Sequence, residues 1–239
     1  MPAAGDLMRA LDALGDPEAA AFKQRFFKTG PGEYGEGDVF IGLDVPTVRR
    51  EVRPYKDLPL PEVAELLASK IHEHRFAASV ILADRATKLA RKGDSAGTQE
   101  LYDFYLQHRP GINNWDIVDN SCRAVVGGHL LLIGDPAPMT ELAMGENLWT
   151  RRIGIVSTWT FTRAGDTDPI FEIAPLVLDD PRDLTHKAVG WMLREAGTKD
   201  RARLERFLAE YAAVMPRTAL RYSIEHFTPE QRKHWLAAK

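Results

Sequence analysis

The sequence of 239 residues contains a single cysteine, Cys122, and this scarcity excludes several classes of protein. One cysteine cannot form a disulfide within the chain, and it rules out zinc sites built from cysteine pairs. Low cysteine content fits a reducing compartment, so we expect a cytoplasmic location. No histidine stands at a motif spacing from Cys122, which favours a small buried side chain over a nucleophile.

Long apolar runs are also missing. Nowhere do 18 apolar residues follow one another, and the first residues lack the basic and apolar regions of a signal peptide. We therefore expect a soluble protein with no membrane partner. Alternation of apolar and polar residues, which is typical of strands, is nearly absent, and this predicts an all-α fold.

A glycine-rich segment at about 29–38 contains the pattern G-x-G-x-x-G at Gly30, Gly32 and Gly35. In dinucleotide-binding proteins that pattern follows a strand and opens a helix, whereas here a helix predicted over about 5–28, with a break at Asp16-Pro17, precedes it. The Lys-Ser or Lys-Thr pair of a phosphate-binding loop is missing as well. We therefore predict a flexible surface loop.

From residue 45 onward, predicted helices alternate with short breakers. Five of these helices resemble one another, since each opens with a polar or basic residue and continues into small and apolar ones. They lie near His74, Asn114, Trp149, Thr185 and Met215. Their spacing of about 31 to 41 residues lies in the range of two-helix repeats, which predicts an α-solenoid whose second helices line the concave face.

The formal net charge of −3 conceals an uneven distribution. From Arg182 to Lys239 there are 12 Lys and Arg residues against 7 Asp and Glu residues, so this part is basic and the rest is acidic. A basic surface suits an anionic partner, although many helical proteins carry a solvated basic face that binds nothing.

The predicted inner helices carry two indoles, one carboxylate and several cations. Trp115 and Asp119 lie four residues apart and therefore share one helix face. Taken alone, a tryptophan and an aspartate near a helix start indicate packing and capping more often than function. Projection of the inner helices onto one surface adds six groove residues: Arg152, Lys187, Trp191, Arg194, Arg217 and Arg221.

This combination of side chains points to chemistry on a nucleic acid. Arginine and lysine neutralise phosphates, and indoles offer flat faces to sugars or bases. A carboxylate repels phosphates, so Asp119 is expected to face a transient positive charge. Hydrolysis of a glycosidic bond supplies that charge, because the sugar becomes oxocarbenium-like as the base departs. A purine alkylated on N3 or N7 is already cationic and leaves with little acid assistance.

Three segments together resemble a known family: Asn-Trp-Asp-Ile-Val-Asp at 114–119, Asn-Leu-Trp-Thr-Arg-Arg at 147–152, and His-Lys-Ala-Val-Gly-Trp-Met-Leu-Arg-Glu at 186–195. They are similar to the signature segments of the AlkD-like DNA alkylation repair family, bacterial alkylpurine DNA glycosylases made of HEAT-like repeats. The similarity runs from about Phe26 to the C-terminus.

The resemblance implies one HEAT-like repeat domain over 1–239, forming a right-handed superhelix with a concave DNA-binding face. It implies excision of cationic alkylpurines such as 3-methyladenine and 7-methylguanine from double-stranded DNA without a metal or a cofactor. We expect a monomer, because nothing in the sequence demands a partner subunit. It also assigns roles, which we list together: Asp119 matches the catalytic carboxylate, Trp115 and Trp191 the sugar-contacting indoles, Arg152 a phosphate-contacting arginine, and Lys187 and Arg194 further groove residues.

Two features depart from the family pattern. Phe26 stands where a tyrosine is expected, and the glycine-rich segment is longer, so the range of substrates is expected to depend on this end of the groove. Two other functions fit the same fold: a module that binds distorted or branched DNA without chemistry, and an adaptor for protein partners. Asp119 favours the enzyme, because phosphate contacts alone do not call for a carboxylate.

Structural roles are predicted for three further residues. His72 and His74 form an H-x-H pattern, but no carboxylate or third ligand stands at a useful spacing, so a metal site is not expected. Asp116 is expected either to support the start of its helix or to hold a neighbouring site residue in place.

Overall fold

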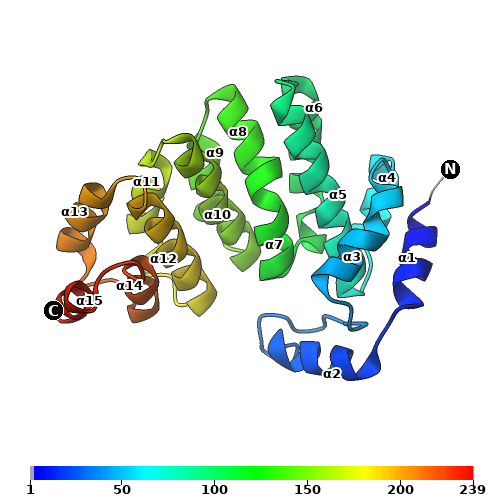
Figure 1. Ribbon diagram of the computed structural model, residues 1–239, viewed down its shortest axis with the longest axis horizontal. Helices are drawn as coiled ribbons and strands as arrows, with labels where there is room; N and C mark the ends of the chain where they lie inside the picture. Colours follow the sequence, from blue (N-terminus) through cyan, green and yellow to red (C-terminus); the bar gives the residue numbers. More distant parts are fainter. Residues whose placement is uncertain (1–2, 239) are drawn as a thin grey trace. The chain divides into compact units, whose positions relative to one another are not determined.

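The structure, a computed structural model that describes residues 3–238, consists of helices joined mostly by short turns, with a long connection between α2 and α3 (Figure 1). In chain order the α-helices are α1 (Ala4–Asp12), α2 (Pro17–Phe26), α3 (Val45–Val52), α4 (Leu60–Leu67), α5 (His72–Arg91), α6 (Ser95–Gln107), α7 (Trp115–Cys122), α8 (Gly128–Ile133), α9 (Ala137–Ala143), α10 (Leu148–Ala164), α11 (Asp168–Leu176), α12 (Asp183–Gly197), α13 (Arg201–Tyr211), α14 (Arg217–Ser223) and α15 (Pro229–Leu236). The prediction of an all-α fold is confirmed. Over the same residues, no helix has both the length and the apolar character that a membrane crossing requires.

Helix starts follow from local capping chemistry. The carboxylate of Asp16 accepts hydrogen bonds from the next helical N–H groups, and Pro17 supplies the fixed φ that suits a first turn. This confirms the predicted break between α1 and α2. In the same way, the side chain of Asn147 accepts from the N–H groups of Trp149 and Thr150, the second and third residues of α10.

The predicted helix pairs are present and they stack. α4 packs on α5, α9 on α10, and α11 on α12, while α10 also packs on α12 and α12 on α14. The five expected second helices correspond to α5, α7, α10, α12 and α14. Such stacked pairs make the fold an all-α repeat solenoid.

Contacts divide the chain into two compact units, Met1–Ser121 and Cys122–Lys239, and the boundary falls near the end of α7. Each unit has its own buried apolar core, with Leu7, Leu58, Leu66, Ile81 and Ile117 in the first unit and Met139, Ile153, Ile173, Leu193 and Leu220 in the second. One continuous repeat domain over 1–239 stays a prediction.

Two glycines permit close helix packing in the second unit. A Cβ atom on Gly154 of α10 would meet the backbone of Met139 and Ala143 in α9. A Cβ atom on Gly190 of α12 would meet the carbonyl of Ala219 in α14. A side chain at either glycine would therefore push two helices apart.

After α7 the chain passes through a π-helical turn, η3 (Arg123–Gly127), into α8. A π turn breaks the regular backbone ladder, and two side chains of α10 supply hydrogen bonds there. Thr160 Oγ1 donates to the carbonyl of Arg123 at 2.6 Å, and Ser157 Oγ donates to the carbonyl of Cys122 at 3.2 Å. Single π turns within helices are frequent at functional sites.

The glycine-rich segment folds back along the end of α2 (Figure 1). The N–H of Gly35 donates to the carbonyl of Lys28 at 3.1 Å. Residues 31–33 and 36–37 are exposed, as predicted for a surface loop. Asp38, at the end of the segment, departs from that prediction because only 7% of it is exposed.

Candidate functional site

The first turn of α7 begins with Trp115, and Asp119 follows one turn later on the same helix face, as the spacing predicts. Both residues are half-buried. The indole of Trp115 lies nearly parallel to the ring of Phe27, with centroids 5.1 Å apart and planes 10° apart. Phe26 meets the indole edge-on at 6.3 Å. Aromatic packing from the end of α2 therefore holds Trp115.

A buried set of polar side chains ties the start of α7 to α5 and to the glycine-rich segment; we name this set the His72 network (Asp38, His72, Arg75, Asn114 and Asp116). His72 Nδ1 lies 2.8 Å from Asp38 Oδ2, and His72 Nε2 lies 2.9 Å from Asp116 Oδ2. Arg75 donates to Asp38 Oδ1 at 2.5 Å. Asn114 donates to Asp38 at 3.0 Å, and its side-chain oxygen accepts from the first backbone N–H of α7 at 2.8 Å.

Electrostatics inside the network favour a charged histidine. Burial by itself would lower the pKa of His72, but the hydrogen bonds and negative charges of Asp116 and Asp38 raise it to about 9. Burial would likewise raise the pKa of Asp38, yet His72 and Arg75 hold it below its usual value. The imidazolium therefore donates to one carboxylate from each nitrogen at neutral pH. Two cations balance two carboxylates, which makes burial of this set acceptable.

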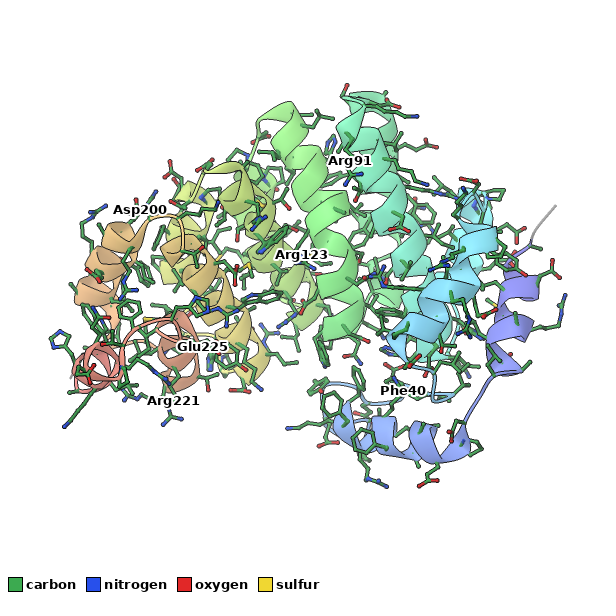
Figure 2. The ribbon with its side chains drawn as sticks, in the orientation of Figure 1. Phe40, Arg91, Arg123, Asp200, Arg221 and Glu225 are labelled. Atoms are coloured by element: carbon green, nitrogen blue, oxygen red, sulfur yellow. The ribbon has the colours of Figure 1, made fainter. Side chains whose placement is uncertain are left out.

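A column of aromatic rings runs beside the network. Phe40, between α2 and α3 (Figure 2), stacks on His72 with ring centroids 4.2 Å apart. Phe27 stacks on Phe40 at 4.7 Å and also on Trp115. The ring of His72 is thus connected to the indole of Trp115 through two phenylalanine rings, as well as through hydrogen bonds.

These contacts correct the sequence-based interpretation of the H-x-H pattern. Two carboxylates do reach His72, from 34 and 44 residues away in the sequence, which is why no local spacing revealed them. His74 contacts Ser69 and Asp12 instead, at 2.9 Å and 3.0 Å. Within residues 3–238, no group of three His, Cys, Asp or Glu side chains has an arrangement that could hold a metal ion. Asp116 Oδ1 accepts from the N–H of Ile117 at 2.9 Å, which confirms its predicted role at the helix start.

In the second unit, α12 carries Lys187, Trp191 and Arg194 at helical spacing on one face. Trp191 Nε1 donates to Glu195 Oε1 at 3.2 Å. Arg194 pairs with the same carboxylate at 3.1 Å and also with Glu225. Glu195 therefore fixes an indole and a guanidinium together, a role that the sequence did not reveal.

Arg123 is a second residue that sequence reasoning missed. Its guanidinium carbon lies 4.7 Å from the ring centroid of Trp159 and 5.9 Å from that of Trp191, within the range of cation–π attraction. The side chain is labelled in Figure 2. The sequence feature that could have indicated Arg123 is its position four residues after Asp119, which is the spacing of neighbours on one helix face.

The predicted DNA-contacting cations nearest the core of the second unit are already engaged with the protein. Arg152 is buried, with 6% of it exposed, and it donates to the carbonyl of Leu184 in the first turn of α12 at 2.9 Å. Lys187 is half-buried and pairs with Asp183 at 2.9 Å. Arg152 therefore also joins α10 to α12, whereas the ion pair of Lys187 lies within α12.

The predicted cations on α14 are more accessible. Arg217 is exposed and donates to the carbonyl of Leu236 at 2.7 Å. Arg221 is exposed, and its side chain projects outward from α14 (Figure 2). It forms no ion pair with any residue in the range 3–238. The structure thus places Trp115 and Asp119 together on α7 of the first unit, and the other six predicted residues on α10, α12 and α14 of the second.

Comparison with known proteins adds three findings. A family model described as DNA alkylation repair enzyme matches residues 7–227. No curated protein matches the sequence. Among solved structures, a predicted DNA alkylation repair enzyme from Enterococcus faecalis is 17% identical, with a TM-score of 0.68 over 90% of this chain and 97% of that one. At that identity the likeness shows a shared fold.

Proposed function

The chain belongs to the DNA alkylation repair enzyme family, and from that premise we propose that it is a glycosylase for cationic alkylated purines, namely 3-methyladenine and 7-methylguanine, in double-stranded DNA. The observation that carries this proposal is the Trp115 and Asp119 pair. The pair offers an indole and a carboxylate on one helix face, and the indole is held by Phe27.

The chemistry of such a substrate matches what the pair can do. Alkylation on N3 or N7 gives the purine a positive charge, so the base leaves as a neutral molecule without protonation by the enzyme. The sugar becomes oxocarbenium-like as the C–N bond breaks, and the carboxylate of Asp119 stabilises it and orients the attacking water. The face of Trp115 adds cation–π attraction of about 1–2 kcal/mol once water is excluded.

The second unit supplies the remaining proposed contacts. Trp191, fixed by Glu195, is the second indole for the sugar. Arg152, Lys187, Arg194, Arg217 and Arg221 are the proposed phosphate contacts on the concave face of a right-handed solenoid. Arg217 and Arg221 are the strongest candidates among these because they are exposed, whereas Arg152 is buried and Lys187 and Arg194 are half-buried.

Release of free base from methylated DNA tests the proposal. Duplex DNA treated with a methylating agent is incubated with the protein, and released 3-methyladenine and 7-methylguanine are separated by chromatography and quantified. We expect the parent protein to release both, and Asp119→Asn to release far less while still binding the DNA. Asp84→Asn, which changes an exposed carboxylate on α5, is the matched control and should behave like the parent.

Two other functions give different results in the same assay. A module that only binds damaged or branched DNA would retain the DNA and release no base. A protein adaptor would do neither. Either result with the parent protein would overturn the glycosylase proposal.

A further inference from the structure

The side chain of Asp38 closes the glycine-rich segment onto two helices. All three of its partners in the His72 network come from elsewhere: His72 and Arg75 from α5, and Asn114 from the residue before α7. With 7% of Asp38 exposed, its loss would leave these buried donors without an acceptor. Asp38 therefore fixes the end of the glycine-rich segment to α5 and to the residue before α7.

His72 joins Asp38 to α7. Its backbone N–H donates to the carbonyl of Val39 at 2.8 Å, and the ring of Phe40 stacks on the imidazole with centroids 4.2 Å apart. These contacts hold the imidazole in place. From this fixed place it reaches Asp38 with one nitrogen and Asp116 with the other. Asp116 stands between Trp115 and Asp119 in the sequence, within the first turn of α7.

We propose that His72, held between Asp38 and Asp116, is a positioning residue for the reaction: it fixes the first turn of α7 and so the direction in which Trp115 and Asp119 face the substrate. The inference rests on the proposed glycosylase function and gives the glycine-rich segment a role in it. Because Asp119 lies on the same rigid helix, a displacement at Asp116 is transmitted to it.

The size of the expected effect follows from how steeply such reactions depend on geometry. A displacement of about 1 Å of a catalytic group can cost about 100-fold in rate. His72→Ala removes both hydrogen bonds to the carboxylates and also leaves a space beside Phe40. We therefore expect the rate constant for base release to fall by about 10- to 100-fold, while the dissociation constant for DNA changes by less than about threefold.

A purely structural role would also destabilise the protein, so the experiment needs a matched control. His74 lies on the same helix and is equally buried, at 3% exposed against 2% for His72, but its contacts are Ser69 and Asp12 rather than α7. His74→Gln should lower the melting temperature yet leave the single-turnover rate constant of the folded protein close to that of the parent.

Two substitutions at Asp116 distinguish the effect of losing the hydrogen bond to His72 from a general loss of stability. In Asp116→Asn the amide oxygen can still accept from His72 Nε2, whereas in Asp116→Ala it cannot. Asp116 lies nearer the surface than His72, with 16% of its side chain exposed against 3%, so its loss is better tolerated by the fold. Single-turnover rate constants and DNA dissociation constants are measured for both variants. We expect Asp116→Asn to keep most of the rate and Asp116→Ala to lose about as much as His72→Ala.

Several results would overturn the inference. These are a folded His72→Ala or Asp116→Ala protein that releases base as fast as the parent, or a loss in His74→Gln as large as that in His72→Ala.

A second measurement keeps this inference separate from the proposed function. The chain has five tryptophans, so five indole N–H signals are expected in a ¹H–¹⁵N correlation spectrum, and each is assigned by a Trp→Phe substitution. Positioning by His72 predicts that His72→Ala shifts or broadens the Trp115 signal, and that His74→Gln does not. If the parent releases no base, the proposed function fails while this result still holds. An unchanged Trp115 signal in His72→Ala would exclude the positioning role itself.

Discussion

Substitution of His72 by glutamine is predicted to remove a pH-dependent contribution to stability on the alkaline side of neutrality. Burial opposes the charged imidazole, but Asp116 and Asp38 prevail and raise the folded-state pKa from 6.5 to about 9. Because the folded state binds this proton more tightly than the unfolded state, the contribution is complete below pH 6.5 and is lost as the pH rises through about 9. Glutamine does not titrate, so the variant lacks this pH-dependent contribution to stability.

The magnitude follows from the two pKa values. A difference between 6.5 and about 9 corresponds to a contribution of about 3 kcal/mol to the free energy of unfolding. Such a contribution is a large part of the stability of a typical domain, which is roughly 5–15 kcal/mol. It should therefore be measurable above the effects of other titrating groups.

Urea unfolding followed by circular dichroism, at pH values spaced from about 6 to about 10, measures the effect for the parent and for His72→Gln. The parent should lose about 3 kcal/mol more than the variant over that range. Other groups are common to both proteins, so their contributions cancel in the comparison. Parallel curves for the two proteins would contradict this prediction, because they would mean that His72 gains no proton affinity on folding.

Three further predictions follow from packing and charge. Phe27→Ala removes a buried ring that stacks on Trp115, so it should cost about 3–5 kcal/mol in urea unfolding and change the tryptophan fluorescence; an unchanged midpoint would contradict the packing described. Gly190→Ala should cost about 1–3 kcal/mol because the new Cβ meets α14, whereas Gly128→Ala, whose Cβ meets only one atom at 3.9 Å, should be neutral or stabilising; equal effects would argue against close packing at Gly190. Arg221→Ala should weaken DNA binding and reduce the slope of log affinity against log salt by about 1, and an unchanged slope would exclude a phosphate contact.

The repeat architecture and the Trp115 and Asp119 pair could be predicted from the sequence because both depend on local spacing. The breaker at Asp16-Pro17 and the repeated pattern of the second helices are signals carried by neighbouring residues. The same holds for the pair, since a four-residue interval on a helix fixes a shared face whatever the rest of the chain does.

The His72 network could not be predicted in this way. Asp38 and Asn114 are 76 residues apart, and neither stands in a pattern that marks the other. Arg152 shows a similar limit, since helical spacing places it on an inner face but does not reveal that the carbonyl of Leu184 binds it there. Such contacts arise from how elements distant in sequence pack, and only the fold displays them.

We propose that Asp119 stabilises the sugar cation during departure of an alkylated purine. A duplex oligonucleotide with one 7-methylguanine, incubated with excess protein, gives the single-turnover rate constant for base release, and a binding titration on the same duplex gives the dissociation constant. We predict that Asp119→Asn lowers the rate constant by about 100-fold or more, as loss of an electrostatic transition-state contact does, with the dissociation constant nearly unchanged. A parent that releases no 7-methylguanine, or an Asp119→Asn variant that releases it as fast as the parent, would contradict the claim.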